Sequence, residues 1–313
     1  MNKNKNNILT NKIVVCIIAT ICCGLWGSAF PYVKIGYKLF NITDTSSQIL
    51  FAGLRFTLAG IMTILIGSVL NKKFLFPLKT SWKPVFTLSF FQTFVQYLFF
   101  YIGLSITTGV KASLIEGTCA FFSILIASLI FKQEKLTWLK IVACFIGFGG
   151  VIISNINGVS FTTGLSGDLM ILVSTLSYAF SSVLIKKYSQ KENPVTLSGY
   201  QFFMGGLALT LVGLFMGGKL SNYTVESVSV LLYLGLLSAI AYSLWGIILK
   251  HNKVSNVTVY SFMIPVFGVI LSALLVESER ASAFKPENII ALILVSIGII
   301  IVNKISDKSR PPA

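Results

Sequence analysis

Long apolar runs, separated by short polar and charged clusters, extend along the whole chain. A bilayer core about 30 Å thick is crossed by roughly 20 residues of apolar helix. Ten runs of this length occur, and they are apolar throughout instead of alternating, which favours helices over the strands of a barrel. The pattern predicts an all-α membrane protein with ten transmembrane helices. These lie near residues 13–35, 48–69, 84–105, 110–131, 138–155, 167–186, 196–216, 229–249, 255–276 and 287–304.

Lysine and arginine are concentrated in every second loop. The side that carries the N-terminal tail has 18 of the 25 basic residues, the opposite side has six, and Arg55 lies inside a span. Because cytoplasmic loops carry the excess of basic residues, both termini are predicted to be cytoplasmic, as an even number of spans requires. The first run has no convincing cleavage site and is predicted to be the first membrane anchor. We expect a multi-pass protein of the cell (plasma) membrane.

Composition supports a lipid environment and excludes several function classes. Only 11% of the residues are charged, whereas a soluble domain has about a quarter. The net charge of +15 is spread over loops and forms no patch on a folded domain, so no nucleic-acid partner is expected. The five cysteines lie in apolar runs and the one histidine, His251, lies in a loop. Neither a disulfide framework nor a metal site is expected, and no cofactor.

The two halves of the chain resemble one another. A shift of 146 residues superposes three glycines of the second span on three of the seventh, Gly53, Gly60 and Gly67 on Gly199, Gly206 and Gly213. Since each half has five spans, an odd number, the second half must insert inverted, an architecture common among secondary transporters. The expected organisation is a cytoplasmic tail (1–12), a five-helix repeat (13–155), an external linker (156–166), an inverted five-helix repeat (167–304) and a cytoplasmic tail (305–313).

Four short motifs carry a family resemblance. They are WGSAFP at 26–31, LRF at 54–56, FKQEKL at 131–136 and PVFG at 265–268. In their order and spacing the chain resembles, over nearly its whole length, the ten-helix EamA-type branch of the drug/metabolite transporter superfamily. The resemblance implies a carrier of small metabolites, in a family with many exporters, whose central cavity is lined by helices 1, 3, 4, 6, 8 and 9.

The chain departs from the family pattern at two places. Where the fourth helix of the family often has proline this chain has Phe121, so a less kinked helix is expected there. The family also implies a glutamate in the second half opposite Glu134, and Glu277 and Glu279 both lie near that position. We expect these three glutamates to be structural charges that orient helix ends, because each has lysines or an arginine nearby.

Glu116 is the leading candidate for a functional group. It is predicted to lie about six residues into the fourth span. A charge near the bilayer centre costs roughly 2.5–3.5 kcal/mol, so this carboxyl group must face protein or a wet cavity. It is predicted to bind a cationic or zwitterionic substrate, or to carry a proton. A structural ion pair with Lys111 or Arg55 is the alternative.

Arg55 allows two interpretations. It points away from the glycine stripe of its own helix, and it could hold a substrate carboxylate or extend to the headgroup region. Because the resemblance places the second helix outside the cavity lining, we expect a structural charge.

Polar and aromatic side chains on the other helices predict a mixed pocket, the usual composition of a small-molecule site. Amides and prolines inside spans favour positions that face protein or a cavity. The remaining predicted substrate-binding residues are Trp26, Tyr32, Gln92, Gln96, Tyr97, Tyr178, Ser182, Tyr242, Trp245 and Tyr260.

Together these features predict a secondary transporter of a small polar metabolite, such as an amino acid or amine, that works by alternating access. Export, and proton coupling through Glu116, are the expected details, and the protein is expected to be a monomer or homodimer in the lipid bilayer. No Walker-type glycine loop indicates a built-in ATPase. An alternative is a membrane-embedded sensor or scaffold with the same fold. An intramembrane enzyme is less consistent, since no nucleophile with a base and no paired aspartates lie in the spans.

Overall fold

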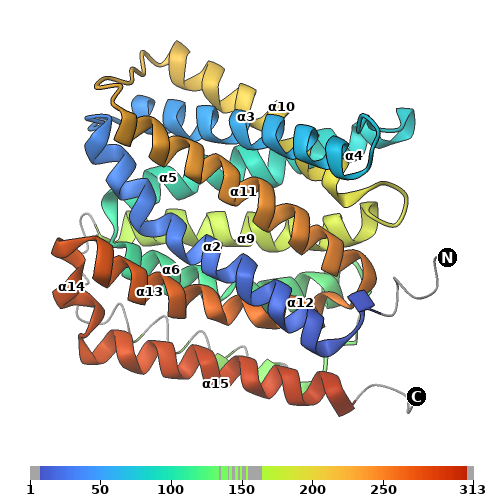
Figure 1. Cartoon of the computed structure of the whole chain (residues 1–313). Helices are drawn as coiled ribbons and strands as arrows, with labels where there is room; N and C mark the ends of the chain where they lie inside the picture. The colour runs from blue at the N-terminus through green and yellow to red at the C-terminus, as the bar shows by residue number, and fades with distance from the viewer. Residues whose placement is uncertain are drawn as a thin grey trace.

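The protein is a bundle of long helices that run roughly alongside one another, as a computed structural model shows (Figure 1). Among the residues that the structure describes there is no strand, and eight helical segments are long and apolar enough to cross a membrane. This confirms the predicted all-α membrane class. The described residues are 8–133, 135–139, 141–142, 145–146, 149, 153 and 164–308.

Four of these segments belong to the first half. The first two are single helices, α2 (Lys12–Leu39) and α3 (Thr45–Leu70). The third consists of η1 (Lys79–Ser81), α4 (Trp82–Leu88), η2 (Ser89–Val95) and α5 (Gln96–Ile106), and the fourth of α6 (Gly109–Gly117), α7 (Cys119–Leu125) and η3 (Ile126–Ile130). The fifth predicted span, 138–155, and the predicted linker lie mostly outside the described residues.

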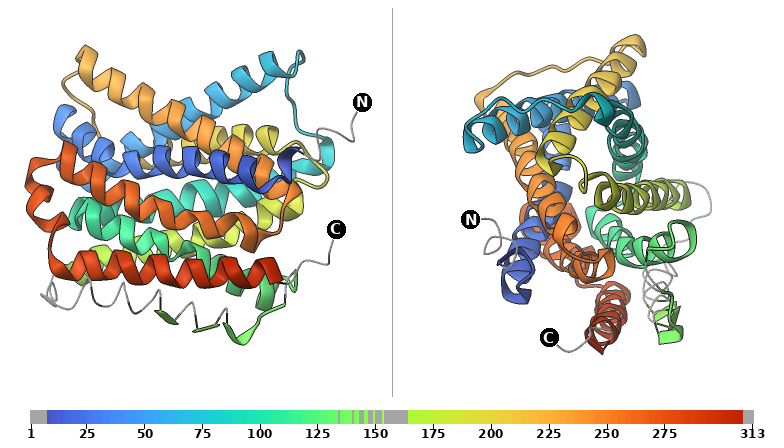
Figure 2. Two further views of the ribbon diagram at one scale, coloured as in Figure 1. Left: turned by 60° about the horizontal axis from the view of Figure 1, so that its bottom comes forward. Right: turned by 90° about the vertical axis from the view of Figure 1, so that its right-hand side faces the viewer.

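The second half has four more segments and a peripheral helix. They are α9 (Gly164–Tyr188), α10 (Pro194–Phe215), α11 (Val225–His251), and the series α12 (Val254–Thr258), η4 (Val259–Phe262) and α13 (Met263–Leu275). The short helix α14 (Glu277–Ala283) then leads to α15 (Pro286–Lys308), which packs against α6, α12, α14 and η4 at the edge of the bundle (Figure 2).

Small polar residues fix where several helices begin. The carboxylate of Asp44 accepts the backbone N–H of Ser47 at the start of α3, and the hydroxyl of Thr108 accepts that of Lys111 at the start of α6. Thr224 forms a reciprocal capping box at the start of α11. Such caps satisfy N–H groups that have no partner within the helix. The two ends of the bundle are named here after the ends of α2: the Lys12 end (right in Figure 1) and the Leu39 end (left).

The distribution of polarity is the reverse of that in a soluble protein. Large aliphatic side chains such as Leu65 and Leu211 are more than half exposed on the outer faces of α3 and α10. Arg55 and Gln201, on the same two helices, are 1% and 0% exposed. An apolar exterior around a buried polar interior is stable only where the surrounding solvent is hydrocarbon. The chain is a multi-pass membrane protein.

Two helices that correspond in the repeat, α3 and α10, pack directly on each other in antiparallel directions. Gly60 lies against the backbone nitrogen of Phe203, and Gly206 lies against that of Thr57. Phe203 follows Thr57 by the same 146 positions that separate Gly206 from Gly60. The two contacts are therefore copies of one contact, related by the internal repeat.

The next glycines along each helix repeat this relationship. Gly53 lies against the backbone of Thr210, and Gly199 lies near Ile64, again pairs that a shift of 146 exchanges. A pseudo-twofold axis therefore passes between α3 and α10, and the two helices approach closely because glycine has no Cβ.

Three segments change helical type near the middle of the membrane. The third segment contains a π-helix (η2), and the segment of α12 and α13 contains the 3₁₀ turn η4. The fourth segment breaks at Thr118, between α6 and α7. Irregular turns inside spans often mark functional sites.

The break at Thr118 lies three residues before Phe121, where a less kinked helix is expected from the missing proline. The backbone N–H of Thr118 bonds the carbonyl of Ile115, three residues back, at 3.0 Å, and the hydroxyl of Thr118 donates to the same oxygen at 2.6 Å. This tight turn interrupts the regular helix without a proline.

Candidate functional site

A narrow cavity lies between the two halves near the middle of the helices. Its volume is about 40 Å³, where one water molecule needs roughly 10–15 Å³. It therefore has room for a few water molecules, and a metabolite requires the surrounding side chains to move apart. The lining residues are Trp26, Ala29, Phe30, Arg55, Gln96, Tyr97, Phe100, Glu116, Tyr178, Tyr242 and Ile264.

Glu116 lines this cavity from α6, two residues before the break at Thr118, and is 6% exposed. Its Oε1 accepts hydrogen bonds from the hydroxyls of Thr175, at 3.2 Å, and Ser174, at 3.4 Å, on α9. Within the described part of the chain no lysine or arginine nitrogen lies within 4.0 Å of it. The carboxyl group is thus buried without a cation.

The alternative ion pairs for Glu116 are not found. Lys111 places its Nζ 3.7 Å from the carboxylate of Asp168 on α9. Arg55 uses its Nε on the carbonyl of Leu234, at 3.1 Å. Neither cation neutralises Glu116 in this conformation.

Arg55 also lines the cavity, although the family resemblance placed its helix outside the lining. Its Nη1 donates to the hydroxyl of Tyr101 at 2.7 Å, and its Nη2 donates to that of Ser238 at 3.0 Å. The guanidinium group lies 4.8 Å from the ring centre of Phe56 and does not extend to the headgroup region.

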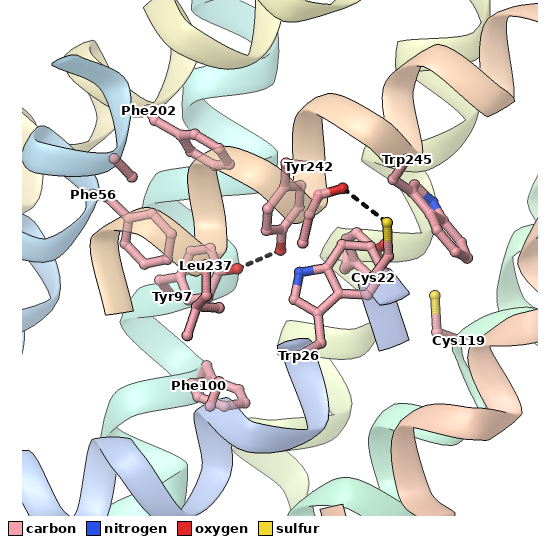
Figure 3. Packing of buried hydrophobic residues seen from close by; sticks show 14 of the residues in the cluster. Cys22, Trp26, Phe56, Tyr97, Phe100, Cys119, Phe202, Leu237, Tyr242 and Trp245 are labelled. Carbon is pink, nitrogen blue, oxygen red and sulfur yellow. Dashed lines mark hydrogen bonds between the residues drawn. The ribbon is translucent and has the colours of Figure 1, made fainter. Parts of the chain in front are cut away.

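Two phenols and an amide connect the walls of the cavity. The hydroxyls of Tyr97 and Tyr242 point toward one another and share a hydrogen bond, dashed in Figure 3. Gln96 donates its Nε2 to the Tyr242 hydroxyl at 3.3 Å. This group joins α5 of the first half to α11 of the second.

Three buried polar atoms at the cavity have no hydrogen-bond partner among the described residues. They are Nε1 of Trp26, Oε1 of Gln96 and the hydroxyl of Tyr178. Buried polar groups are rarely left unpaired, because each costs about 1–3 kcal/mol. Water or a ligand in the cavity can satisfy all three.

An aromatic layer borders the cavity. The rings of Tyr242 and Trp245 lie beside that of Trp26 (Figure 3), with centres 5.1 Å and 4.9 Å away. The ring centre of Tyr178 lies 5.7 Å from that of Trp26, and all three contacts are edge-on. Toward the Leu39 end, Phe30 and Phe100 lie with ring centres 5.7 Å apart. Aromatic rings thus lie along the cavity on the side of each end of the bundle.

At the Leu39 end an ion pair joins the two halves. Nζ of Lys34, on α2, lies 3.1 Å from Oε1 of Glu279, on α14, and also donates to the carbonyl of Thr107 at 2.9 Å. The same carboxylate oxygen accepts the backbone N–H of Gly109 at 2.9 Å. Of the two candidates for the second glutamate, Glu279 is buried at this end and Glu277 is exposed, while Glu134 lies outside the described residues.

The remaining sequence candidates lie outside the cavity lining. Tyr32 packs on Tyr233 with ring centres 4.6 Å apart, and Gln92 accepts a hydrogen bond from Gln201 at 2.6 Å. Trp245 supports Trp26, whereas Ser182 is buried and Tyr260 lies in η4. The cavity therefore gathers Trp26, Gln96, Tyr97, Glu116, Tyr178 and Tyr242 from the predicted set, together with Arg55.

Sequence reasoning missed both apolar wall residues and hydroxyl partners. Phe30 and Phe100 line the cavity, but nothing separates them in the sequence from the other 23 of the 25 phenylalanines. Ser174 and Thr175 could have been found from the sequence, because two adjacent hydroxyl groups inside an apolar run indicate a polar partner on another helix. Among the described residues no three His, Cys, Asp or Glu side chains come together as metal ligands would.

Comparison with known proteins identifies related chains. The sequence profile of the EamA-like transporter family matches residues 12–156 and again residues 165–304. An uncharacterized transporter of Archaeoglobus fulgidus is 28% identical over 266 residues, which cover 83% of this chain and 89% of that one. The uncharacterized transporter YvbV of Bacillus subtilis is 22% identical over 297 residues, which cover 92% of this chain and 91% of that one.

A solved crystal structure has the same fold. It superposes with a TM-score of 0.70 and covers 96% of this chain and 100% of its own, at 16% sequence identity.

Proposed function

This chain belongs to the EamA-like transporter family, and we propose that it is a secondary transporter of a small polar metabolite with an amino group, an amino acid or an amine. The substrate binds in the central cavity and moves by alternating access. The protein lies in the plasma membrane with both termini in the cytoplasm, and it exports its substrate.

The observation that carries this proposal is the environment of Glu116. A carboxyl group that is 6% exposed, with two hydroxyl donors and no cation within ion-pair distance in the described part of the chain, is costly in a membrane protein. A substrate ammonium group in the cavity supplies the missing positive charge. Aromatic rings around Trp26 add an apolar surface to the cavity.

The arrangement of the two halves supports alternating access. The cavity is lined from both halves, and α3 and α10 meet along a seam related by the pseudo-twofold axis. Two equivalent halves that can exchange conformations give two states of similar energy, open to opposite sides. The Lys34–Glu279 ion pair stabilises the state that is closed at the Leu39 end. Glu116 exchanges the coupling proton when the substrate leaves.

Uptake into proteoliposomes tests the proposal. Purified protein is reconstituted and assayed with a panel of radiolabelled amino acids and amines, next to protein-free liposomes and the variant Glu116→Gln. We expect at least one compound to be taken up faster than in protein-free liposomes and Glu116→Gln to slow its uptake about tenfold or more, the loss of one charge-assisted bond. If wild type and Glu116→Gln behave alike with every compound, the proposed function is wrong.

A further inference from the structure

Arg55 is a buried cation without an anion. Three of its five N–H donors are used, on the carbonyl of Leu234 and the hydroxyls of Tyr101 and Ser238, none of which carries a negative charge. Its side chain is 1% exposed, and no carboxylate lies within 4.0 Å in the part of the chain that the structure describes. Aromatic rings face the guanidinium group, that of Phe56 at 4.8 Å, but two N–H groups remain for another partner and no anion balances the charge.

Glu116 is the converse, a buried carboxyl group without a cation in the same cavity. The two charges do not pair with each other, and the hydroxyls of Tyr97 and Tyr242 line the space that both reach. Each isolated charge costs several kcal/mol in a low-dielectric interior. A structural pair would bring the charges into contact, whereas these two flank a space.

The internal repeat provides a control within the chain. The residue that corresponds to Arg55 under the shift of 146 is Gln201, which is 0% exposed and donates to Gln92 at 2.6 Å. A neutral amide thus fulfils the structural role at this position of the fold. It joins the seventh helix to the third, just as Arg55 joins the second helix to the eighth. The second half thus has a neutral side chain where the first half has a charge.

The position of Glu116 shows the same asymmetry. The first helical residues of the fourth and ninth segments, Gly109 and Val254, are 145 positions apart. The same shift takes Glu116 to Ser261, a buried neutral side chain. Both charges of the cavity therefore occur in the first half and have neutral counterparts in the second.

Three unpaired atoms complete the site. The indole N–H of Trp26 is a donor, the amide oxygen Oε1 of Gln96 is an acceptor, and the hydroxyl of Tyr178 can do either. They line the cavity beside Arg55 and Glu116. For a carboxylate, which needs donors, the cavity offers the guanidinium group of Arg55 and the indole N–H of Trp26. For an ammonium group, which needs acceptors, it offers the carboxyl group of Glu116 and the amide oxygen of Gln96.

We propose that the cavity selects a zwitterion, an amino acid whose carboxylate binds Arg55 and whose ammonium group binds Glu116. The inference rests on the proposed transport function and names its substrate class. Arg55 is then a substrate-binding residue and not a structural charge. An amine without the carboxylate leaves Arg55 unpaired, and an acid without the amino group leaves Glu116 unpaired. Both are rejected, because a site built for polar partners disfavours a ligand that lacks them.

The test compares three ligands that share one side chain. The best-transported amino acid from the uptake panel is assayed beside its decarboxylated amine and its deaminated acid, by uptake and by the shift in melting temperature of the purified protein. For wild type we expect the amine and the acid to bind at least about tenfold more weakly than the amino acid. Equal binding of the amine and the amino acid overturns the zwitterion inference but leaves the proposed transport function intact.

The variant Arg55→Gln copies the residue of the second half. We expect it to lower affinity for the amino acid about tenfold or more while affinity for the amine stays within about twofold, and Arg55→Lys to restore part of the loss. If Arg55→Gln weakens both ligands equally, Arg55 is structural and the inference is wrong. If Arg55→Gln does not fold, Arg55→Lys and Glu116→Gln are compared with wild type instead. In Glu116→Gln, the affinity for the deaminated acid must rise relative to the affinity for the amino acid. If wild type transports no amino compound at all, the proposed function itself fails.

Discussion

Lys34 on α2 and Glu279 on α14 form an ion pair, with the nitrogen 3.1 Å from Oε1, that joins the first half of the chain to the second. Glu279 has a side chain only 4% exposed, and it also accepts the backbone N–H of Gly109 at the start of α6. One carboxylate thus holds two helices of the first half against the second at the Leu39 end.

Removing the positive charge at position 34 should open this end. In a background with the native cysteines replaced by alanine, Phe100→Cys reports on the cavity through an impermeant maleimide added outside. We expect Lys34→Met to speed labelling roughly tenfold, since charge-assisted hydrogen bonds contribute about 1.5–3 kcal/mol to the closed state. Lys38→Met, which removes an exposed lysine of the same helix, is the control. Equal labelling in both variants would show that the ion pair does not hold the closed state.

Glu116 should couple transport to protons. If its carboxyl group exchanges a proton with each substrate, an imposed pH gradient drives uptake in wild type. In Glu116→Gln the residual uptake becomes independent of the gradient, because the amide does not titrate. Glu226→Gln, at the exposed start of α11, removes a carboxylate far from the cavity and keeps the dependence. A gradient effect that survives in Glu116→Gln contradicts this role.

The seam between α3 and α10 should not tolerate a methyl group. Because a Cβ on Gly60 or Gly206 would overlap the facing backbone, Gly60→Ala and Gly206→Ala should each destabilise the protein by about 1–3 kcal/mol. The two losses should be similar, since the pseudo-twofold axis exchanges the positions. Gly24→Ala is the control, because its Cβ would lie 3.8 Å from the ring of Phe267, an ordinary contact. Melting in detergent measures all three, and a Gly60→Ala variant as stable as Gly24→Ala would refute the close seam.

The stabilisation of α3 by its N-terminal cap, Asp44, should depend on pH. Hydrogen bonds from the hydroxyl of Ser46 and the backbone N–H of Ser47 lower the pKa of Asp44 to about 2 from its usual 3.8. Because the folded-state pKa is the lower one, this stabilisation is complete above pH 3.8 and is lost as the pH falls toward 2. We expect Asp44→Ala to cost about 1 kcal/mol at pH 6, and Asp44→Asn much less. The difference in melting temperature between wild type and Asp44→Ala should narrow as the pH falls from about 4 to about 2; a constant difference would mean that the ionised carboxylate is not the cap.

The membrane class and the internal repeat could be predicted from the sequence because both produce patterns that extend over many residues. Runs of apolar residues reveal spans without any knowledge of packing, and the glycines at 53, 60 and 67 have counterparts at fixed separation. The same patterns identified Glu116 and Gln96, since a polar group in hydrocarbon must face inward. The family resemblance placed the helix of Arg55 outside the cavity lining, whereas its guanidinium group lines the cavity and donates to the hydroxyl of Tyr101.

Other features depend on contacts that no local pattern encodes. At the break, the hydroxyl and the backbone N–H of Thr118 both donate to the carbonyl of Ile115, an arrangement that the residue types permit but do not require. The hydroxyls of Ser174 and Thr175 meet Glu116 only because α9 packs beside α6. Glu277 and Glu279 differ by two positions, and the helical turn of α14 alone decides which of them is buried.

The central claim is that the two halves move against each other about one shared cavity. Spin labels test it at both ends in parallel samples: Lys38→Cys with Phe284→Cys at the Leu39 end, and Lys83→Cys with Lys191→Cys at the Lys12 end, all exposed positions. We predict that the transported amino acid changes the two distances in opposite directions, one shortening as the other lengthens. Distances that lengthen together, or that do not respond while the substrate binds, would contradict alternating access in this protein.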